Sequence, residues 1–124
     1  MNLILDTHTL AWIASNDARL AKSVTNALGD ADTRLIVSAV TAYEYSDLLT
    51  RGRLPSSVDI DILLAVLGFD LVDYSASLWR VAARLPDIHR DPVDRMLVAH
   101  AIALDATIAT ADTDMHKYPV KTLW

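Results

Sequence analysis

Short apolar runs and longer amphipathic segments follow one another along the chain. The apolar runs do not alternate with polar residues, which is typical of strands covered on both faces. Buried strands are predicted at Asn2–Leu5, Leu35–Ser38, Phe69–Val72, Thr107–Ala109 and Val120–Leu123. Amphipathic segments with capping residues, ended by glycine or proline, predict helices. These are expected at Thr7–Ser15, Ala18–Leu28, Val40–Arg53, Val58–Leu67, Ala76–Leu85 and Asp91–Leu104.

This order of elements predicts the fold class. Helical segments separate most of the strands, which favours a three-layer α/β/α sandwich with a mainly parallel sheet of about five strands. The 124 residues are expected to form one domain, residues 1–124, with a single real core. In such folds the functional crevice lies beyond the carboxyl ends of the strands.

Composition narrows the possible classes of function. The chain is 52% hydrophobic and contains no cysteine, so disulfides, zinc–thiolate sites and cysteine nucleophiles are excluded. No apolar run reaches the length of a membrane span, and no signal peptide is recognised at the start. A cytoplasmic location is therefore expected. The net charge of −5 argues against a simple nucleic-acid coat, yet it permits an enzyme that holds phosphates through bound cations.

Acidic residues lie where the crevice is expected. Asp6 follows the first strand, and Asp112 follows the strand Thr107–Ala109. Glu44, the sole glutamate, and Asp94 lie in helices that could reach the same edge. Clustered carboxylates repel one another unless cations or protons neutralise them. Because oxygen ligands suit Mg²⁺ or Mn²⁺, these four residues are candidate metal ligands and catalytic residues.

Each acid also has a purely structural interpretation. Asp6 is suited to capping the helix that starts at Thr7. The segment Thr41–Glu44 matches a capping box, and Asp91–Asp94 matches a capped helix start with proline at its first position. The segment Ala111–Asp114 is suited to a plain turn.

Four blocks of the sequence resemble PIN-domain proteins of the VapC toxin type. They occur in the order found in that family and cover essentially the whole chain. The blocks are Leu3–His8, Ser38–Glu44, His89–Ala101 and Ile108–Asp114. One departure is His100, where this subgroup often has glutamine; no role is assigned to it.

The resemblance implies a function and a set of site residues. It implies a metal-dependent endoribonuclease that uses Mg²⁺ or Mn²⁺ to activate water. It also implies a toxin with RNA as substrate, a cognate antitoxin protein as partner, and a homodimer. The residues that match the acidic site of the family are Asp6, Glu44, Asp94 and Asp112, with Asp91, Thr110 and Asp114 as secondary matches.

Three further side chains lie near these acids in sequence. Arg95 would either neutralise an acid, hold RNA, or be an ordinary surface arginine. His8 is more typical of a helix face or a cap than of a metal ligand. His89 lies before Asp91, where phosphate contact and a solvated loop are both possible, and the loop is favoured.

Other classes of function remain as alternatives. One is a PIN fold without catalysis that acts as a binding module. Another is a phosphatase with Asp6 as nucleophile, but that chemistry usually needs an acid two residues later, where this chain has His8. A receiver domain would need a lysine after a late strand, and Thr110–Asp114 contains none.

The antitoxin partner implied by the resemblance would bind an exposed apolar surface. This surface is predicted at Ala42–Leu49 and Leu10–Ile13.

Overall fold

The protein is an α/β sandwich built on one parallel sheet, as the sequence predicts. The computed structural model describes residues 1–124. Its elements are β1 (Asn2–Leu5), α1 (Thr7–Ser15), α2 (Lys22–Leu28), β2 (Arg34–Ser38), α3 (Ala39–Thr50), α4 (Ile60–Leu67), β3 (Asp70–Val72), α5 (Leu78–Ala83), α6 (Pro92–Ala103), β4 (Thr107–Ala109), the 3₁₀ helix η1 (Thr113–Lys117) and β5 (Thr122–Leu123). The five strands are parallel throughout and lie in the order β3-β2-β1-β4-β5.

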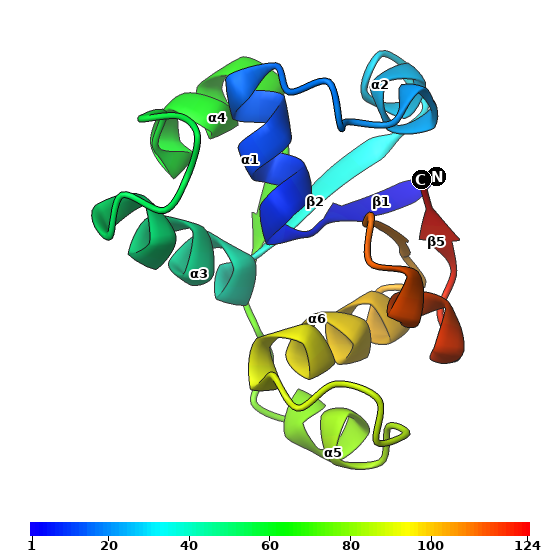
Figure 1. Cartoon of the computed structure of the whole chain (residues 1–124). Coiled ribbons are helices and arrows are strands. Elements are labelled where there is room, and N and C mark those ends of the chain that lie inside the picture. The colour runs from blue at the N-terminus through cyan, green and yellow to red at the C-terminus, as the bar shows by residue number, and fades with distance from the viewer.

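The two faces of the sheet bury separate apolar clusters. Successive side chains of a strand point to opposite faces. Leu3 and Leu5 of β1 accordingly pack in a cluster with residues of α1 to α4, whereas Ile4 packs in a second cluster with α6 and η1. Figure 1 shows these helices on either side of the sheet, with α5 outside α6. Covering on both faces explains why the strands are uniformly apolar.

The strand order changes direction at β1. From β1 the chain moves to β2 and then β3 on one side, and later to β4 and β5 on the other. Leu5 is in register with Ala109, so β1 and β4 end side by side. The Ala109 carbonyl accepts hydrogen bonds from the Asp6 amide at 3.3 Å and the Thr9 hydroxyl at 2.9 Å. A crevice beyond these two strand ends is the expected binding position in such a sheet.

Several predicted details differ from the structure. The second helix begins at Lys22 rather than Ala18, because the Asp17 carboxylate binds the amide and guanidinium of Arg19 and holds a turn there. The 3₁₀ helix η1 was not predicted. Leu10, Ala11 and Tyr45 are buried, so the prediction of apolar docking surfaces at Leu10–Ile13 and Ala42–Leu49 is wrong for these three residues. No helix combines the length and apolar composition of a membrane span.

His100 is a buried structural residue. Its Nδ1 lies 2.9 Å from the Ser38 hydroxyl, and its ring packs edge-on against Tyr74. Burial lowers the pKa of His100, which favours the neutral imidazole inside the core. Ser38 Oγ also caps α3 by accepting the Val40 amide. The histidine therefore ties α6 to the start of α3.

Candidate metal centre

A pocket of about 280 Å³ opens at the carboxyl edge of the sheet. We call it the acidic pocket, because four of its wall residues are carboxylates. Its walls are formed by Asp6, Thr7, His8, Thr41, Glu44, Leu48, Asp91, Val93, Asp94 and Leu97. These residues lie in α1, α3 and α6 or directly before α1 and α6, and the parallel topology brings these segments together.

Asp6 and Glu44 are each held by one hydrogen bond. Asp6 Oδ1 accepts the Thr9 amide at 2.8 Å and so caps α1. Glu44 Oε1 accepts the hydroxyl of the buried Thr7. The capping-box interpretation of Thr41–Glu44 is wrong, because Ser38 is the cap of α3 and Thr41 lies inside the helix. In each residue the second carboxylate oxygen makes no hydrogen bond within the protein.

Asp91 and Asp94 belong to the start of α6. Asp91 Oδ1 accepts the Val93 amide at 2.8 Å, with Pro92 at the first helical position, as the sequence predicts. Asp94 lies one turn further on and is half-buried. Burial, together with the charges of Asp91, Glu44 and Asp112, raises the pKa of Asp94 to about 6. Ionisation of Asp94 is thus disfavoured first by its burial and then by the like charges around it.

The residues of the acidic pocket fit a hard divalent cation. The wall contains no lysine or arginine to neutralise its carboxylates. The hydroxyl of Thr41, which is also in the wall, is buried and has no hydrogen-bond partner. Carboxylate and hydroxyl oxygens, without sulfur, are the donor set that Mg²⁺ or Mn²⁺ prefers.

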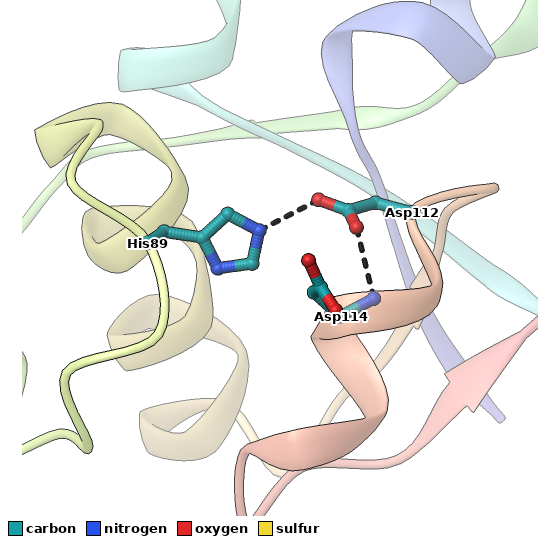
Figure 2. A group of neighbouring side chains, drawn as sticks. All are labelled: His89, Asp112 and Asp114. Atoms are coloured by element: carbon teal, nitrogen blue, oxygen red, sulfur yellow. Dashed lines mark hydrogen bonds and ion pairs between the residues drawn. The ribbon is translucent and has the colours of Figure 1, made fainter.

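Asp112 lies beside the acidic pocket rather than in its wall. Its charge still contributes to the raised pKa of Asp94. Figure 2 shows its carboxylate between the His89 ring and the start of η1. Asp112 Oδ2 lies 2.7 Å from His89 Nε2, and Oδ1 accepts the Asp114 amide at 2.9 Å. Three of the four predicted acids thus line one pocket together with Asp91, and the fourth is bonded to a histidine next to it.

Three of these acids also serve as helix caps. Asp6, Asp91 and Asp112 each use Oδ1 to accept a backbone amide at the first turn of α1, α6 and η1 respectively. The structural and functional interpretations of these residues are therefore compatible, because each cap occupies one oxygen only. Glu44 and Asp94 cap nothing.

The secondary candidates have distinct positions. Thr110 is buried, and its hydroxyl accepts the Asp112 amide at 3.1 Å. Asp114 is exposed and forms an ion pair with Lys117 at 2.8 Å, which lowers the pKa of Asp114. Arg95 donates to the carbonyls of Ala82 in the last turn of α5 and of Leu85 and Pro86 just after it. Its guanidinium forms no ion pair with the pocket acids, so Arg95 does not neutralise them and instead ties α6 to the segment around the end of α5.

His89 is the residue whose surroundings the sequence did not reveal. A solvated loop was favoured at this position, yet the His89 side chain is only 13% exposed and is bonded on both ring nitrogens. The nearest signal in the sequence was its place just before Asp91. Its partners, Asp112 and Tyr118, lie 23 and 29 residues away, and no local pattern links them. His8 is exposed, lines the acidic pocket, and packs at a tilt against Trp12.

Comparisons with known proteins agree with this fold. A family model described as "PIN domain" matches residues 3–121. The chain is 27% identical over 128 residues to "Ribonuclease VapC22" of Mycobacterium tuberculosis, covering 98% of each protein.

Solved structures with the same fold share little sequence. The chain matches the structure of VapBC2 from Rickettsia felis bound to a DNA fragment from their promoter, with a TM-score of 0.77, 18% identity, and 99% and 98% of the two chains covered. It matches the structure of Mycobacterium tuberculosis VapC20, a Sarcin-Ricin loop cleaving toxin, with a TM-score of 0.65, 16% identity, and 93% of each chain covered. At these identities the likeness concerns the fold.

Proposed function

The chain belongs to the PIN domain family, and on that premise we propose that it is a metal-dependent endoribonuclease and the toxin of a toxin–antitoxin pair. The relative of similar length carries the name ribonuclease, and one structural neighbour is described as a toxin that cleaves the Sarcin-Ricin loop. The observation that carries the proposal is the acidic pocket, which has four carboxylates and no basic residue in its wall apart from His8.

The pocket residues have separate roles in this proposal. Asp6, Glu44 and Asp94 would hold Mg²⁺ or Mn²⁺, with Asp112 completing the donor set from its position beside the pocket. A bound divalent ion supplies Lewis acidity toward a phosphate and lowers the pKa of bound water. Thr7 orients the Glu44 carboxylate through its hydroxyl, and the Thr9 amide orients Asp6. The buried Thr41 hydroxyl offers a polar contact within the same wall.

Cleavage of RNA is the direct test. Purified protein is incubated with total RNA in the presence of Mg²⁺, Mn²⁺ or EDTA, and the cleavage ends are mapped. We expect discrete ends that require the metal. The Asp6→Asn variant should lose cleavage by about 10²-fold or more, about 2.7 kcal/mol of transition-state stabilisation. It should remain folded, because asparagine caps a helix as well as aspartate does.

Asp59→Asn provides a matched control. Asp59 caps α4 by accepting the Ile62 amide at 2.9 Å, as Asp6 caps α1, but it lies outside the acidic pocket. We expect wild-type cleavage from this variant. If Asp6→Asn and Asp59→Asn both cleave as fast as the wild type, Asp6 is only a cap. A folded wild-type protein that cleaves no RNA with either metal would instead favour a PIN fold acting only as a binding module.

An antitoxin protein is the partner that we propose. Two of the solved structures that share this fold are described as VapBC structures. Large apolar side chains are exposed on neighbouring helices, namely Tyr43 on α3 and Ile62 and Val66 on α4, which offers apolar surface to a partner. Co-expression with the adjacent reading frame should yield a stable complex. A homodimer and a cytoplasmic location also belong to this proposal, and light scattering of the purified chain tests the former.

A further inference from the structure

We propose that His89 is a positioning residue for Asp112, held in turn by Tyr118. The inference rests on the proposed function insofar as Asp112 is taken to bind the divalent cation. It goes further by assigning a role to two residues outside the acidic pocket. Figure 2 shows the His89 ring directed at the Asp112 carboxylate from the loop that precedes α6.

The orientation of Asp112 is fixed from both sides. Oδ2 lies 2.7 Å from His89 Nε2, and Oδ1 accepts the Asp114 amide at 2.9 Å. The Asp112 amide is itself bound to the Thr110 hydroxyl. A carboxylate has about four lone-pair sites, so two remain for a cation after these bonds are made. The Asp112 side chain is 38% exposed, which leaves it open to solvent and to ions.

The proton of the histidine follows from the bonds around it. An ionised carboxylate only accepts hydrogen bonds, so His89 Nε2 must carry a proton and donate it to Asp112. The Tyr118 oxygen accepts the His89 backbone amide at 3.0 Å and lies 2.8 Å from Nδ1. When the ring is neutral and Nε2 carries its proton, Nδ1 accepts a hydrogen bond from the Tyr118 hydroxyl. The hydrogen bonds that link Tyr118, His89 and Asp112 thus favour the Nε2–H tautomer of His89.

Tyr118 anchors these hydrogen bonds in the core of the protein. It is buried in the cluster formed with α6 and η1, where Met115 is also buried. The His89 ring stacks on the Tyr118 ring, with 5.4 Å between centroids and 16° between planes. Outer partners of metal ligands commonly fix ligand orientation in this way. The loop before α6 is thereby tied to the segment after β4, which brings Asp112 beside the acidic pocket.

Direct metal binding by His89 fits the contacts less well. His89, Asp112 and Asp114 lie close enough together to share an ion. However, both ring nitrogens of His89 are already bonded, and Asp114 forms an ion pair with Lys117. A cation bound by all three would have to break these contacts. The geometry therefore points to orientation of Asp112 rather than to coordination by His89.

The first test is made on the metal-free wild-type protein. Long-range ¹H–¹⁵N correlation spectra of histidine-labelled protein, recorded at alkaline pH, report the tautomer of each neutral ring. We expect the Nε2–H form for His89 and a change in its signals in the Tyr118→Phe variant. The Nδ1–H form in the wild type would overturn the proposal. This measurement depends neither on activity nor on the folding of a His89 variant.

The second test compares Mn²⁺ affinity, measured by calorimetry, among folded variants. His89→Phe should weaken Mn²⁺ binding by about 10- to 100-fold. In His89→Gln the side-chain amide replaces the Nε2–H donor, and affinity should lie within about threefold of wild type. His116→Gln is the matched control, because His116 is exposed and bonds only to Thr122; its affinity should equal that of the wild type.

The outcomes separate this inference from the proposed function. If wild type binds Mn²⁺ and cleaves RNA, but folded His89→Phe binds Mn²⁺ equally well, the positioning role is wrong and the ribonuclease proposal stands. If His89→Gln loses as much affinity as His89→Phe, the donated hydrogen bond is not the cause. If wild type binds no Mn²⁺, the metal proposal fails, and His89 then has no ligand to position. If His89→Phe does not fold, the tautomer and the His89→Gln affinity decide.

Discussion

Carboxylates have different electrostatic surroundings in the two halves of the candidate metal centre. One half is the acidic pocket, and the other is the group formed by His89, Asp112 and Asp114 beside it. In the acidic pocket, burial and the neighbouring carboxylates raise the pKa of Asp94 to about 6, and the wall holds no lysine or arginine. Beside the pocket, Asp112 is bonded to His89, and Asp114 is paired with Lys117, which lowers the pKa of Asp114. The acidic pocket lacks positive charge, whereas Asp114 beside it is paired with the Lys117 cation and Asp112 is hydrogen-bonded to His89.

This difference indicates where a cation would contribute most. A carboxylate that is already neutralised by a lysine gains little from a metal ion, whereas clustered carboxylates without one gain a great deal. The proposed ion would therefore contribute most in the acidic pocket, and the His89–Asp112 pair would support it from the side. Three experiments would break or sharpen this contrast.

Removing the Asp94 charge should have the largest effect. Asp94→Asn should reduce RNA cleavage by about 10²-fold or more, or about 2.7 kcal/mol. In metal-free protein at neutral pH, the same change should raise the melting temperature, because a half-buried charge among like charges is removed. Thermal melts in EDTA and single-turnover cleavage with Mn²⁺ measure the two effects.

A control for Asp94→Asn lies beyond the other end of α6. Asp105 is exposed and has a left-handed backbone with φ of 49°, which asparagine tolerates well. Asp105→Asn should therefore change neither cleavage nor the melting temperature appreciably. Equal cleavage by folded Asp94→Asn and wild type would remove the distinction between the two halves of the site.

The pH dependence of Mn²⁺ binding should show an intermediate effect. Asp94 must lose its proton to bind a cation, so affinity for Mn²⁺ should rise about tenfold per pH unit up to about pH 6 and then level off. Metal-free stability should change in the opposite direction. The pKa of Asp94 in the folded chain, about 6, exceeds its ordinary value of 3.8, so the contribution of Asp94 to stability should fall as pH rises between these values and stay constant above. Calorimetric titrations of wild type and Asp94→Asn over this range, with melts in EDTA, test both; an identical pH profile in the variant would exclude Asp94 as the cause.

Removing the Asp114 charge should have the smallest effect. Its side chain is 53% exposed and already paired with Lys117, and its backbone amide, which binds Asp112, is unchanged by Asp114→Asn. We expect cleavage within about threefold of wild type, since exposed ion pairs contribute little. A loss as large as that of Asp94→Asn would place Asp114 among the metal ligands.

Local patterns were sufficient to predict much of the scaffold. The first strand with Asp6 after it, and the capped start of α6 at Asp91–Pro92, depend on neighbouring residues only, and both appear as predicted. The parallel sheet followed from the alternation of short apolar runs with helices. That topology was enough to expect Asp6 and Asp112 at one edge.

Contacts between distant segments account for what was missed. His89 depends on Tyr118, 29 residues away, and the guanidinium of Arg95 is directed to α5 by carbonyls that only the folded chain places within reach. The helix start predicted at Ala18 fails because the Asp17–Arg19 contact competes with helix formation. In each case a side chain had several possible partners, and packing selected one.

The double use of Asp6, Asp91 and Asp112 as caps has a consequence for comparing this chain with its relatives over evolution. A descendant that abandoned catalysis would still be selected to keep an oxygen acceptor at these three positions, because losing a helix cap costs about 1 kcal/mol. Glu44 and Asp94 cap no helix, and Asp94 is costly to keep ionised. Selection for folding alone would therefore let Asp94 drift first, which makes position 94 the most informative marker of retained activity among homologues.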